Sequence, residues 1–360
     1  AYKKAIREVK REQKAEVKRQ QSSFDNYTQF DYPESFNELY CGNWIADHTG
    51  VRMFTMMGEM LACYHPILPV QRLINAETGR EKVKIAFQKG AYWKDIIVDK
   101  GIIASANKIV SLADYGISVT SETSRALVKF MSDLENFNID LIETKISTSK
   151  FGWIKDEFMP YGMNIEFDSE SRFKDIFESV QEFGSCDKWF DMVRGLRKTG
   201  RFEINVYLAA SFASVLLKPL NVLPFIVNLW GETGKGKTVA LMVAASIWAN
   251  PAENKYITDP VSTMVALEVR DNILNNLPMI IDDLSKTRDK YGDQFTDIIY
   301  MLCGGKGKDR SNKDLALNSA TSWQNVVLTN IERPLATETM RGGAINRILN
   351  FEMGDGSIFE

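Results

Sequence analysis

The segment 231–238 limits the folds open to this chain more than any other feature. It reads Gly-Glu-Thr-Gly-Lys-Gly-Lys-Thr, a full match to the phosphate-loop pattern GxxxxGK[ST]. An apolar, strand-like run (225–230) precedes it and a helix-forming run (239–248) follows it. Glycines let backbone N–H groups turn toward phosphates, and the amino end of a helix adds partial positive charge. The sequence therefore predicts an α/β fold in which a strand, a phosphate-binding loop and a helix follow one another.

Two side chains of this loop have specific expected roles. We expect Lys237 to reach the β- and γ-phosphates of a nucleoside triphosphate, and the hydroxyl of Thr238 to ligate Mg²⁺. The alternative is an ordinary glycine-rich turn without a ligand. The predicted nucleotide-binding residues are Gly231, Glu232, Thr233, Gly234, Lys235, Gly236, Lys237 and Thr238.

An acidic pair follows a second apolar segment. Residues 278–281 are Pro-Met-Ile-Ile, and Asp282 and Asp283 come directly after them. A nucleoside triphosphatase needs an acid on a neighbouring strand to hold the magnesium shell, and we expect Asp282 to be this metal ligand. Asp283 is then placed to orient or deprotonate the attacking water. Together with the loop, the pair predicts an ATP hydrolase that uses Mg²⁺.

A third apolar segment, 326–329, ends at two polar residues, Thr329 and Asn330. Some ATPases have an additional strand between the phosphate-loop strand and the acidic strand, and its tip carries a polar residue that faces the γ-phosphate. Thr329 and Asn330 both qualify, and Asn330 is the slightly better candidate for this catalytic role. The alternative is an asparagine that merely ends a strand.

A basic, glycine-rich loop precedes this third segment. Residues 304–313 mix Lys and Arg with Gly, Ser and Asn, a composition that cannot pack as core. It suits a mobile hairpin that touches nucleic-acid phosphates, which requires charge and backbone freedom rather than base-reading geometry. An ordinary solvated loop is the alternative. The candidate DNA-binding residues are Lys306, Lys308, Arg310 and Lys313.

The remaining sequence predicts three regions. Residues 1–38 form a basic helix and a linker, 39–190 an α+β accessory domain, and 191–360 an α/β core with a parallel sheet. In the accessory domain we expect a hairpin around Gly79 and a helix over 122–136, capped by Thr120 or Ser121. In the core we expect strands at 225–230, 255–257, 278–282, 326–329 and 347–351, and helices at 201–217, 237–249, 262–275 and 294–302.

The composition, with 44% apolar and 25% charged residues, excludes a disordered, collagenous or coiled-coil chain, whereas the net charge decides nothing. The net charge is −3, although residues 1–20 carry eight Lys and Arg against three Glu, which gives +5. This first helix is either a solvated surface or an arm for nucleic acid or a partner. No apolar run approaches the roughly 20 residues of a membrane span. The four cysteines contain no CxxC pair, which fits a reducing cytoplasm. A zinc site could be assembled from Cys41, His48, Cys63 and His65, but their spacings match no common ligand pattern, and we expect them to be buried or incidental.

Several of these motifs in the same order resemble a known family. The chain is similar to the domain of unknown function 927 family, helicase-like ATPases of bacteriophages and mobile genetic elements that resemble the minichromosome-maintenance branch of AAA+ ATPases. The segments that carry the resemblance are 150–153, 225–251, 277–284, 302–310, 323–332 and 342–347. The resemblance implies a P-loop AAA+ core in a replicative DNA helicase, a hexameric ring that moves on single-stranded DNA in the bacterial host cell.

The resemblance also implies a catalytic arginine supplied by a neighbouring subunit. Arg341 and Arg347 are the candidates, and the family pattern favours Arg347. Two positions depart from that pattern, because Asp283 stands where Glu is usual and Ile331 stands where Gly is common. The sequence given ends soon after the last expected strand, and we expect any lid or winged-helix segment to lie beyond residue 360. A protein-remodelling or DNA-packaging ATPase is the competing interpretation, although a basic pore loop favours nucleic acid.

Overall fold

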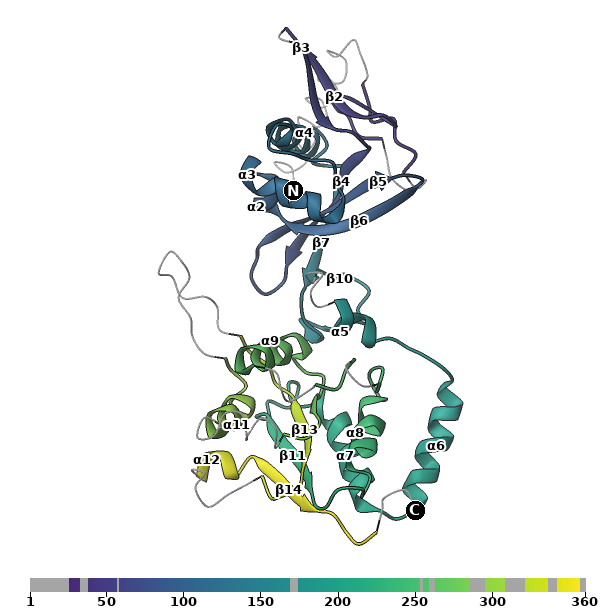
Figure 1. Ribbon diagram of the computed structural model, residues 1–360, viewed down its shortest axis with the longest axis vertical. Helices are drawn as coiled ribbons and strands as arrows, with labels where there is room; N and C mark the ends of the chain where they lie inside the picture. Colours follow the sequence, from purple (N-terminus) through teal and green to yellow (C-terminus); the bar gives the residue numbers. More distant parts are fainter. Residues whose placement is uncertain are drawn as a thin grey trace, which may run out of the picture. The chain divides into compact units, whose positions relative to one another are not determined.

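The chain forms two compact units, residues 1–147 and 148–360. The boundary lies before the expected one at 190, because Phe151, Ile176 and Val180 belong to the apolar core of the second unit. None of the described helices is long and apolar enough to cross a membrane. The predicted helix over 1–20 lies outside the described residues. The computed structural model describes residues 26–32, 38–56, 58–168, 174–252, 255–258, 263–284, 295–307, 321–335 and 342–356 (Figure 1).

Unit 1 is built mainly from antiparallel strands. One sheet is a meander of three short strands, β1 (Ile45–Asp47), β2 (Gly50–Thr55) and β3 (Gly58–Cys63). In a second sheet β7 pairs in parallel with β4, while β5 pairs antiparallel with both β4 and β6. These strands are β4 (Ile67–Asn75), β5 (Glu81–Lys89), β6 (Tyr92–Asp99) and β7 (Glu143–Thr148).

The hairpin predicted around Gly79 is confirmed between β4 and β5. Asn75 Oδ1 accepts hydrogen bonds from the backbone N–H groups of Glu77 (3.1 Å) and Thr78 (3.0 Å), and Gly79 has φ +66°. The asparagine side chain thus satisfies the turn's donors, and glycine supplies the left-handed conformation. The turn therefore fixes the register of the two strands.

The helices of unit 1 include the predicted one, with a different start. The predicted helix over 122–136 is α4 (Ser124–Phe137). It begins after Thr123, so neither Thr120 nor Ser121 is the N-cap. Instead the hydroxyl of Thr120 accepts from the N–H of Glu122 (3.3 Å) in the preceding turn. The apolar side chains of Leu127, Phe130, Met131 and Leu134 on α4 are buried in the core of the unit. The shorter helices are α2 (Lys100–Ile103), α3 (Ala106–Ile109) and η1 (Val110–Tyr115).

Unit 2 contains the expected parallel sheet, and helices lie on both of its faces. The strand order is β12-β13-β11-β14, and all three pairings are parallel. Helices α7 and α8 lie on one side of this sheet, and α9 and α11 lie on the other (Figure 1). The strands are β11 (Phe225–Trp230), β12 (Met279–Ile281), β13 (Val326–Ile331) and β14 (Ile348–Glu352). The helices are α5 (Lys174–Ser179), α6 (Cys186–Lys198), α7 (Phe202–Ser214), α8 (Lys237–Ala245), α9 (Met264–Leu274), α11 (Phe295–Gly304) and α12 (Gly342–Ile345).

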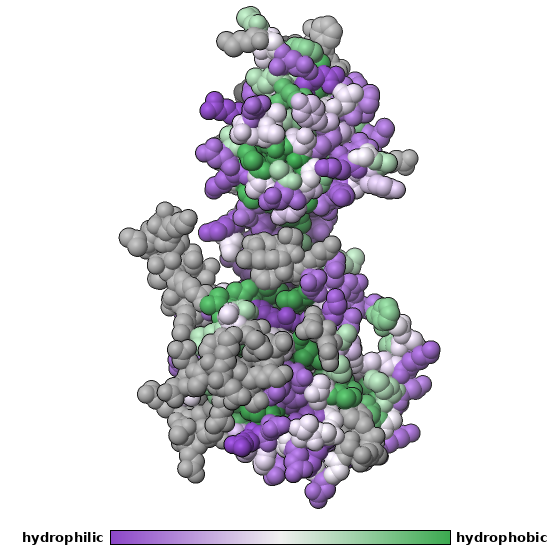
Figure 2. Space-filling model, viewed as in Figure 1, coloured by the Kyte–Doolittle hydropathy of each residue, from purple (hydrophilic) through white to green (hydrophobic). Residues whose placement is uncertain are grey.

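The remaining strands of unit 2 are short. The strand β8 (Gly152–Ile154) pairs antiparallel with β9 (Glu157–Met159), and β10 (Ile165–Phe167) follows them. Much of the coloured surface of both units in Figure 2 is hydrophilic, with apolar residues in small patches between polar ones. Among the described residues, many large apolar side chains are buried in the two cores.

The prediction of a strand at 255–257 is wrong. That segment makes turns, and only Thr258 forms an isolated parallel bridge, with Ile281 of β12. Arg270 on α9 donates to the backbone oxygens of Lys255 (2.9 Å) and Tyr256 (2.6 Å), so both carbonyls already have a hydrogen-bond partner outside the sheet. The other four predicted strands are present, with ends that differ by up to two residues.

The strand β13 is one of the two inner strands of the sheet. It pairs with β11 on one side and with β12 on the other, and all six of its residues are buried. The sequence predicted such a strand between the phosphate-loop strand and the acidic strand, and this order is confirmed. Because the strands are parallel, the residues that follow β11, β12 and β13 meet at one edge of the sheet.

Candidate nucleotide-binding site

The glycine-rich loop joins β11 to α8 with three glycines at positive φ. Gly231 has φ +151°, and Gly234 and Gly236 each have φ +87°. A Cβ at position 231 would lie 2.9 Å from Cβ of Met353, which would force one of the two chain segments to move. Gly236 is the N-cap of α8, so the loop leads directly to a helix amino terminus. The loop thus has the local geometry that a phosphate group requires.

Lys237 is the first residue of α8, and its side chain is folded back onto the loop. Its Nζ donates to the backbone oxygens of Gly231 and Glu232, each at 2.7 Å. Burial lowers the pKa of Lys237 below its usual value, and the carboxylates of Glu332 and Asp283 oppose this effect. The ammonium group is therefore held within the pocket by carbonyl oxygens that a phosphate oxygen could replace.

Three predicted residues from three different elements lie in contact beside the loop: Thr238, Asp282 and Asn330. The hydroxyl of Thr238 donates to Asp282 Oδ1 at 3.0 Å. Asn330 Nδ2 also donates to Asp282 Oδ1, at 2.8 Å, and lies 3.4 Å from Thr238 Oγ1. A hydroxyl and a carboxylate this close form an oxygen donor set that suits Mg²⁺. The residues present therefore fit the metal that the sequence predicts.

The structure distinguishes the two polar candidates at the end of β13. The side chain of Thr329 is fully buried and bonds only weakly to the backbone oxygen of Asn330 (3.4 Å). Asn330 instead bonds to the acidic pair, because its Oδ1 accepts from the backbone N–H of Asp283 at 2.6 Å. Asp283 has φ +54°, an uncommon conformation for a residue other than glycine. Asn330 is thus the residue that contacts both members of the pair.

These residues surround one pocket of about 410 Å³. The sequence did not identify Glu332 as a site residue, although it follows Asn330 by two positions. Its Oε1 accepts a hydrogen bond from the hydroxyl of Thr233 at 2.7 Å, which ties the loop to the end of β13. The signal was an additional acid at the same sheet edge. The lining residues are Thr233, Gly234, Gly236, Lys237, Thr238, Val239, Asp282, Asp283, Asn330, Ile331 and Glu332.

The base of the predicted basic hairpin is present. Gly307 N–H donates to Thr321 O (2.8 Å), and Trp323 N–H donates to Gly305 O (3.0 Å), an antiparallel pairing around Lys306. The hydroxyl of Thr321 donates to Glu268 on α9 (2.7 Å), which anchors the hairpin to the core. Lys306 is exposed. Outside the described residues lie Lys308, Arg310 and Lys313.

Arg347 lies far from this pocket within the same chain. Its backbone oxygen accepts from Ile226 N–H (2.8 Å) at the beginning of β11, and its Nη1 donates to the backbone oxygen of Cys303 (2.7 Å). The phosphate loop starts where β11 ends, roughly 20 Å away for a six-residue strand at ~3.3 Å per residue. The structure therefore does not bring Arg347 to its own phosphate loop. The other candidate, Arg341, lies outside the described residues.

The family model of the domain of unknown function (DUF927) matches residues 46–321, more than three quarters of the chain. The chain belongs to the DUF927 family. The resemblance seen in the sequence is thereby confirmed. No protein with a curated description matches this DUF927 chain.

Two solved structures are similar to the DUF927 chain. One is the active helicase Cch of SCCmec type IV, with a TM-score of 0.65 and 18% identity. The match covers 86% of this chain and 58% of the helicase chain, so the DUF927 chain spans little more than half of it. The A-form apo structure of the NrS-1 C-terminal region has a TM-score of 0.29 and 12% identity, with coverage of 76% and 57%. The first match shows a shared mixed α/β fold, whereas the second is too distant to support one.

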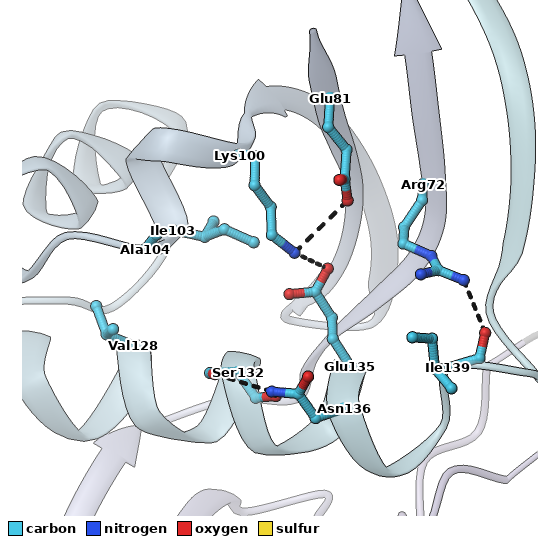
Figure 3. A pocket seen from close by; sticks show the side chains of 10 residues that line it. All are labelled: Arg72, Glu81, Lys100, Ile103, Ala104, Val128, Ser132, Glu135, Asn136 and Ile139. Carbon is cyan, nitrogen blue, oxygen red and sulfur yellow. Dashed lines mark hydrogen bonds and ion pairs between the residues drawn. The ribbon is translucent and has the colours of Figure 1, made fainter. Parts of the chain in front are cut away.

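A second pocket of about 320 Å³ lies in unit 1 of the DUF927 chain (Figure 3). Its charged side chains are largely engaged with one another or with backbone. Lys100 Nζ bridges the carboxylates of Glu81 (3.7 Å) and Glu135, and Arg72 Nη2 donates to the backbone oxygen of Ile139 (2.7 Å). We interpret this group as an ion-pair cluster that fastens α2 and α4 to the sheet.

Proposed function

We propose that this chain is an ATP-dependent DNA helicase of a phage or mobile element, with a P-loop AAA+ core in residues 191–360. The observation that carries the proposal is the contact of Thr238, Asp282 and Asn330 beside the phosphate loop. These residues come from α8, from the end of β12 and from the end of β13. The position of β13 between β11 and β12 supports the same proposal. The fold shared with the helicase Cch agrees with it.

Nucleotide binding would use the loop in a rearranged form. The backbone N–H groups at the start of α8 would contact the phosphates, with Lys237 exchanging its two carbonyl partners for phosphate oxygens. Thr238 and Asp282 would hold Mg²⁺, which when bound neutralises phosphate charge. Asp282 is already hydrogen-bonded to Asn330, so its carboxylate is oriented before the metal arrives.

Hydrolysis would depend on charge and positioning supplied by the pocket and by a neighbouring subunit. Asp283 would orient the attacking water, and Asn330 would hold Asp283 through its backbone N–H. The position of Arg347 at the opposite end of the sheet supports its action on the site of another copy rather than its own. We therefore propose a homo-oligomeric ring, a hexamer, with Arg347 stabilising charge on the transferred phosphoryl group.

The nucleic-acid partner is proposed from the hairpin between α11 and β13. Its anchored base and the four cations in 306–313 support contact with the phosphates of single-stranded DNA. The proposed accessory region 39–190, which includes most of unit 1, would serve as a collar or DNA-entry domain. A role in DNA replication within the cytoplasm of a bacterial host follows from the family resemblance.

The test is ATPase activity with and without single-stranded DNA, measured as released phosphate. We expect clear stimulation by DNA and loss of turnover in Lys237→Ala, because the phosphates lose their main cationic contact. Lys198→Ala is the matched control, since Lys198 is exposed at the end of α6. Normal turnover in Lys237→Ala would remove the loop from the mechanism. Stimulation by an unfolded protein or by duplex DNA alone would favour a remodelling or packaging ATPase.

A further inference from the structure

We infer that Glu332 is a second carboxylate that orients the attacking water, acting together with Asp283; this inference rests on the proposed ATPase function. Glu332 directly follows β13, and it lines the pocket with Lys237, Thr238 and Asp282. Its side chain is exposed, so solvent reaches the carboxylate. Four contacts and charges in the pocket support this assignment.

The first is the hydrogen bond from Thr233. The hydroxyl of Thr233 donates to Glu332 Oε1 at 2.7 Å, so this oxygen accepts an O–H donor on the pocket side of the loop. A water molecule is a donor of the same type. The carboxylate is thus held where it can accept a proton from a hydroxyl group beside the glycine-rich loop.

The second is the shared lining of the pocket. Glu332 lines the cavity together with Lys237, whose Nζ is held at the glycine-rich loop by the backbone oxygens of Gly231 and Glu232. A γ-phosphate bound by Lys237 would therefore share this cavity with the Glu332 carboxylate. Water is a donor that can lie between these two anionic groups.

The third and fourth observations concern Asp283. Its side chain is one methylene shorter than the Glu that the family pattern favours, and its backbone is fixed at φ +54°. Its N–H is also held by Asn330 Oδ1 at 2.6 Å. A short side chain on a fixed backbone has little freedom to follow the substrate. The side chain of Glu332 has one more rotatable bond, and the residue directly follows β13 at the same edge of the sheet.

In the assigned step, the water oxygen forms a bond to the γ-phosphorus while the bond from that phosphorus to the β,γ-bridging oxygen breaks. ADP leaves with the electron pair, and the proton of the water passes to the carboxylate and then to solvent. Asp283 and Glu332 would each accept one O–H of the water, which aims its lone pair at phosphorus.

The deciding variant is Glu332→Gln, because an amide oxygen still accepts from Thr233 while the charge and basicity are lost. We expect kcat to fall by about 100-fold or more, with the dissociation constant of ATP within twofold of wild type. Thr233→Val keeps the carboxylate but loses the tie, so its kcat should fall less. Glu352→Gln, an exposed carboxylate at the end of β14, is the matched control and should match wild type. Normal turnover in Glu332→Gln, or loss of ATP binding with it, overturns the inference.

Failure of this inference and failure of the proposed function give different results. An inactive wild-type protein, with and without DNA, contradicts the ATPase itself. An active wild type that loses turnover in Asp283→Asn but keeps it in Glu332→Gln contradicts only the role of Glu332.

Discussion

Replacing Asn330 by alanine should affect both the stability of unit 2 and its chemistry. The change removes the hydrogen bond to the Asp282 carboxylate (2.8 Å) and leaves the N–H of Asp283 without its 2.6 Å acceptor. A hydrogen bond to a charged group contributes about 1.5–3 kcal/mol, and an unpaired donor costs ~1–3 kcal/mol when buried. Asp283 is only half-buried. We therefore expect a loss of about 2–4 kcal/mol in the free energy of unfolding.

Urea denaturation followed by tryptophan fluorescence measures this loss, with the transition of unit 2 fitted separately. Thr329→Val is the control, because Thr329 is also buried but its hydroxyl makes only the 3.4 Å contact. We expect it to cost about 1 kcal/mol or less. ATP hydrolysis should decline sharply in Asn330→Ala and little in the control. If both variants unfold at the same urea concentration as wild type, the hydrogen bonds of Asn330 contribute nothing to stability and the expected loss is refuted.

Three further predictions concern other parts of the chain. The variant Arg347→Ala should bind ATP and assemble but lose hydrolysis. Mixing it with Lys237→Ala should restore some ATPase activity, because some mixed interfaces contain an intact Lys237 and an intact Arg347. Co-assembly of the two variants without recovery of activity contradicts a site shared between subunits. Burial lowers the pKa of His65, whose Nε2 accepts from Ser118 N–H (2.9 Å), so the unfolded state binds the proton first and stability should decrease below pH ~6.5. Melting temperatures from pH 7.5 to 5.5 test this, and an equal slope in His65→Gln refutes it. DNA affinity should fall, and should depend less steeply on salt concentration, when four cations are neutralised together: Lys306, Lys308, Arg310 and Lys313.

The sequence predicted the parts of the fold that short-range patterns control. The phosphate loop has an unusual run of glycines, and the strands around it are continuous apolar segments, so β11, β12, β13 and β14 could be located within two residues. The turn between β4 and β5 could be predicted from the sequence equally well. The proximity of Thr238, Asp282 and Asn330 followed from the topology of parallel strands, because their carboxyl ends share one edge.

What the sequence could not predict depends on contacts between distant residues. Arg270 binds the carbonyls of Lys255 and Tyr256, and nothing near 255–257 indicates that these oxygens are already engaged. Glu332 could not be identified for a similar reason, since its contact with the loop is the hydrogen bond from Thr233, 99 positions earlier in the chain. The early unit boundary depends on Phe151, whose side chain packs within a core made largely of residues much later in the sequence.

The pairing of β13 on both sides has a consequence for amide hydrogen exchange. Its backbone groups bond to β11 and β12, and its six residues are buried, so exchange there requires the sheet to open. The loop 231–236 has no such ladder and bonds to few backbone partners. The pocket is therefore half rigid and half deformable: Asn330 belongs to a slowly exchanging strand, whereas the glycines belong to a rapidly exchanging turn. A bound phosphate would slow exchange in the turn and leave the strand almost unchanged.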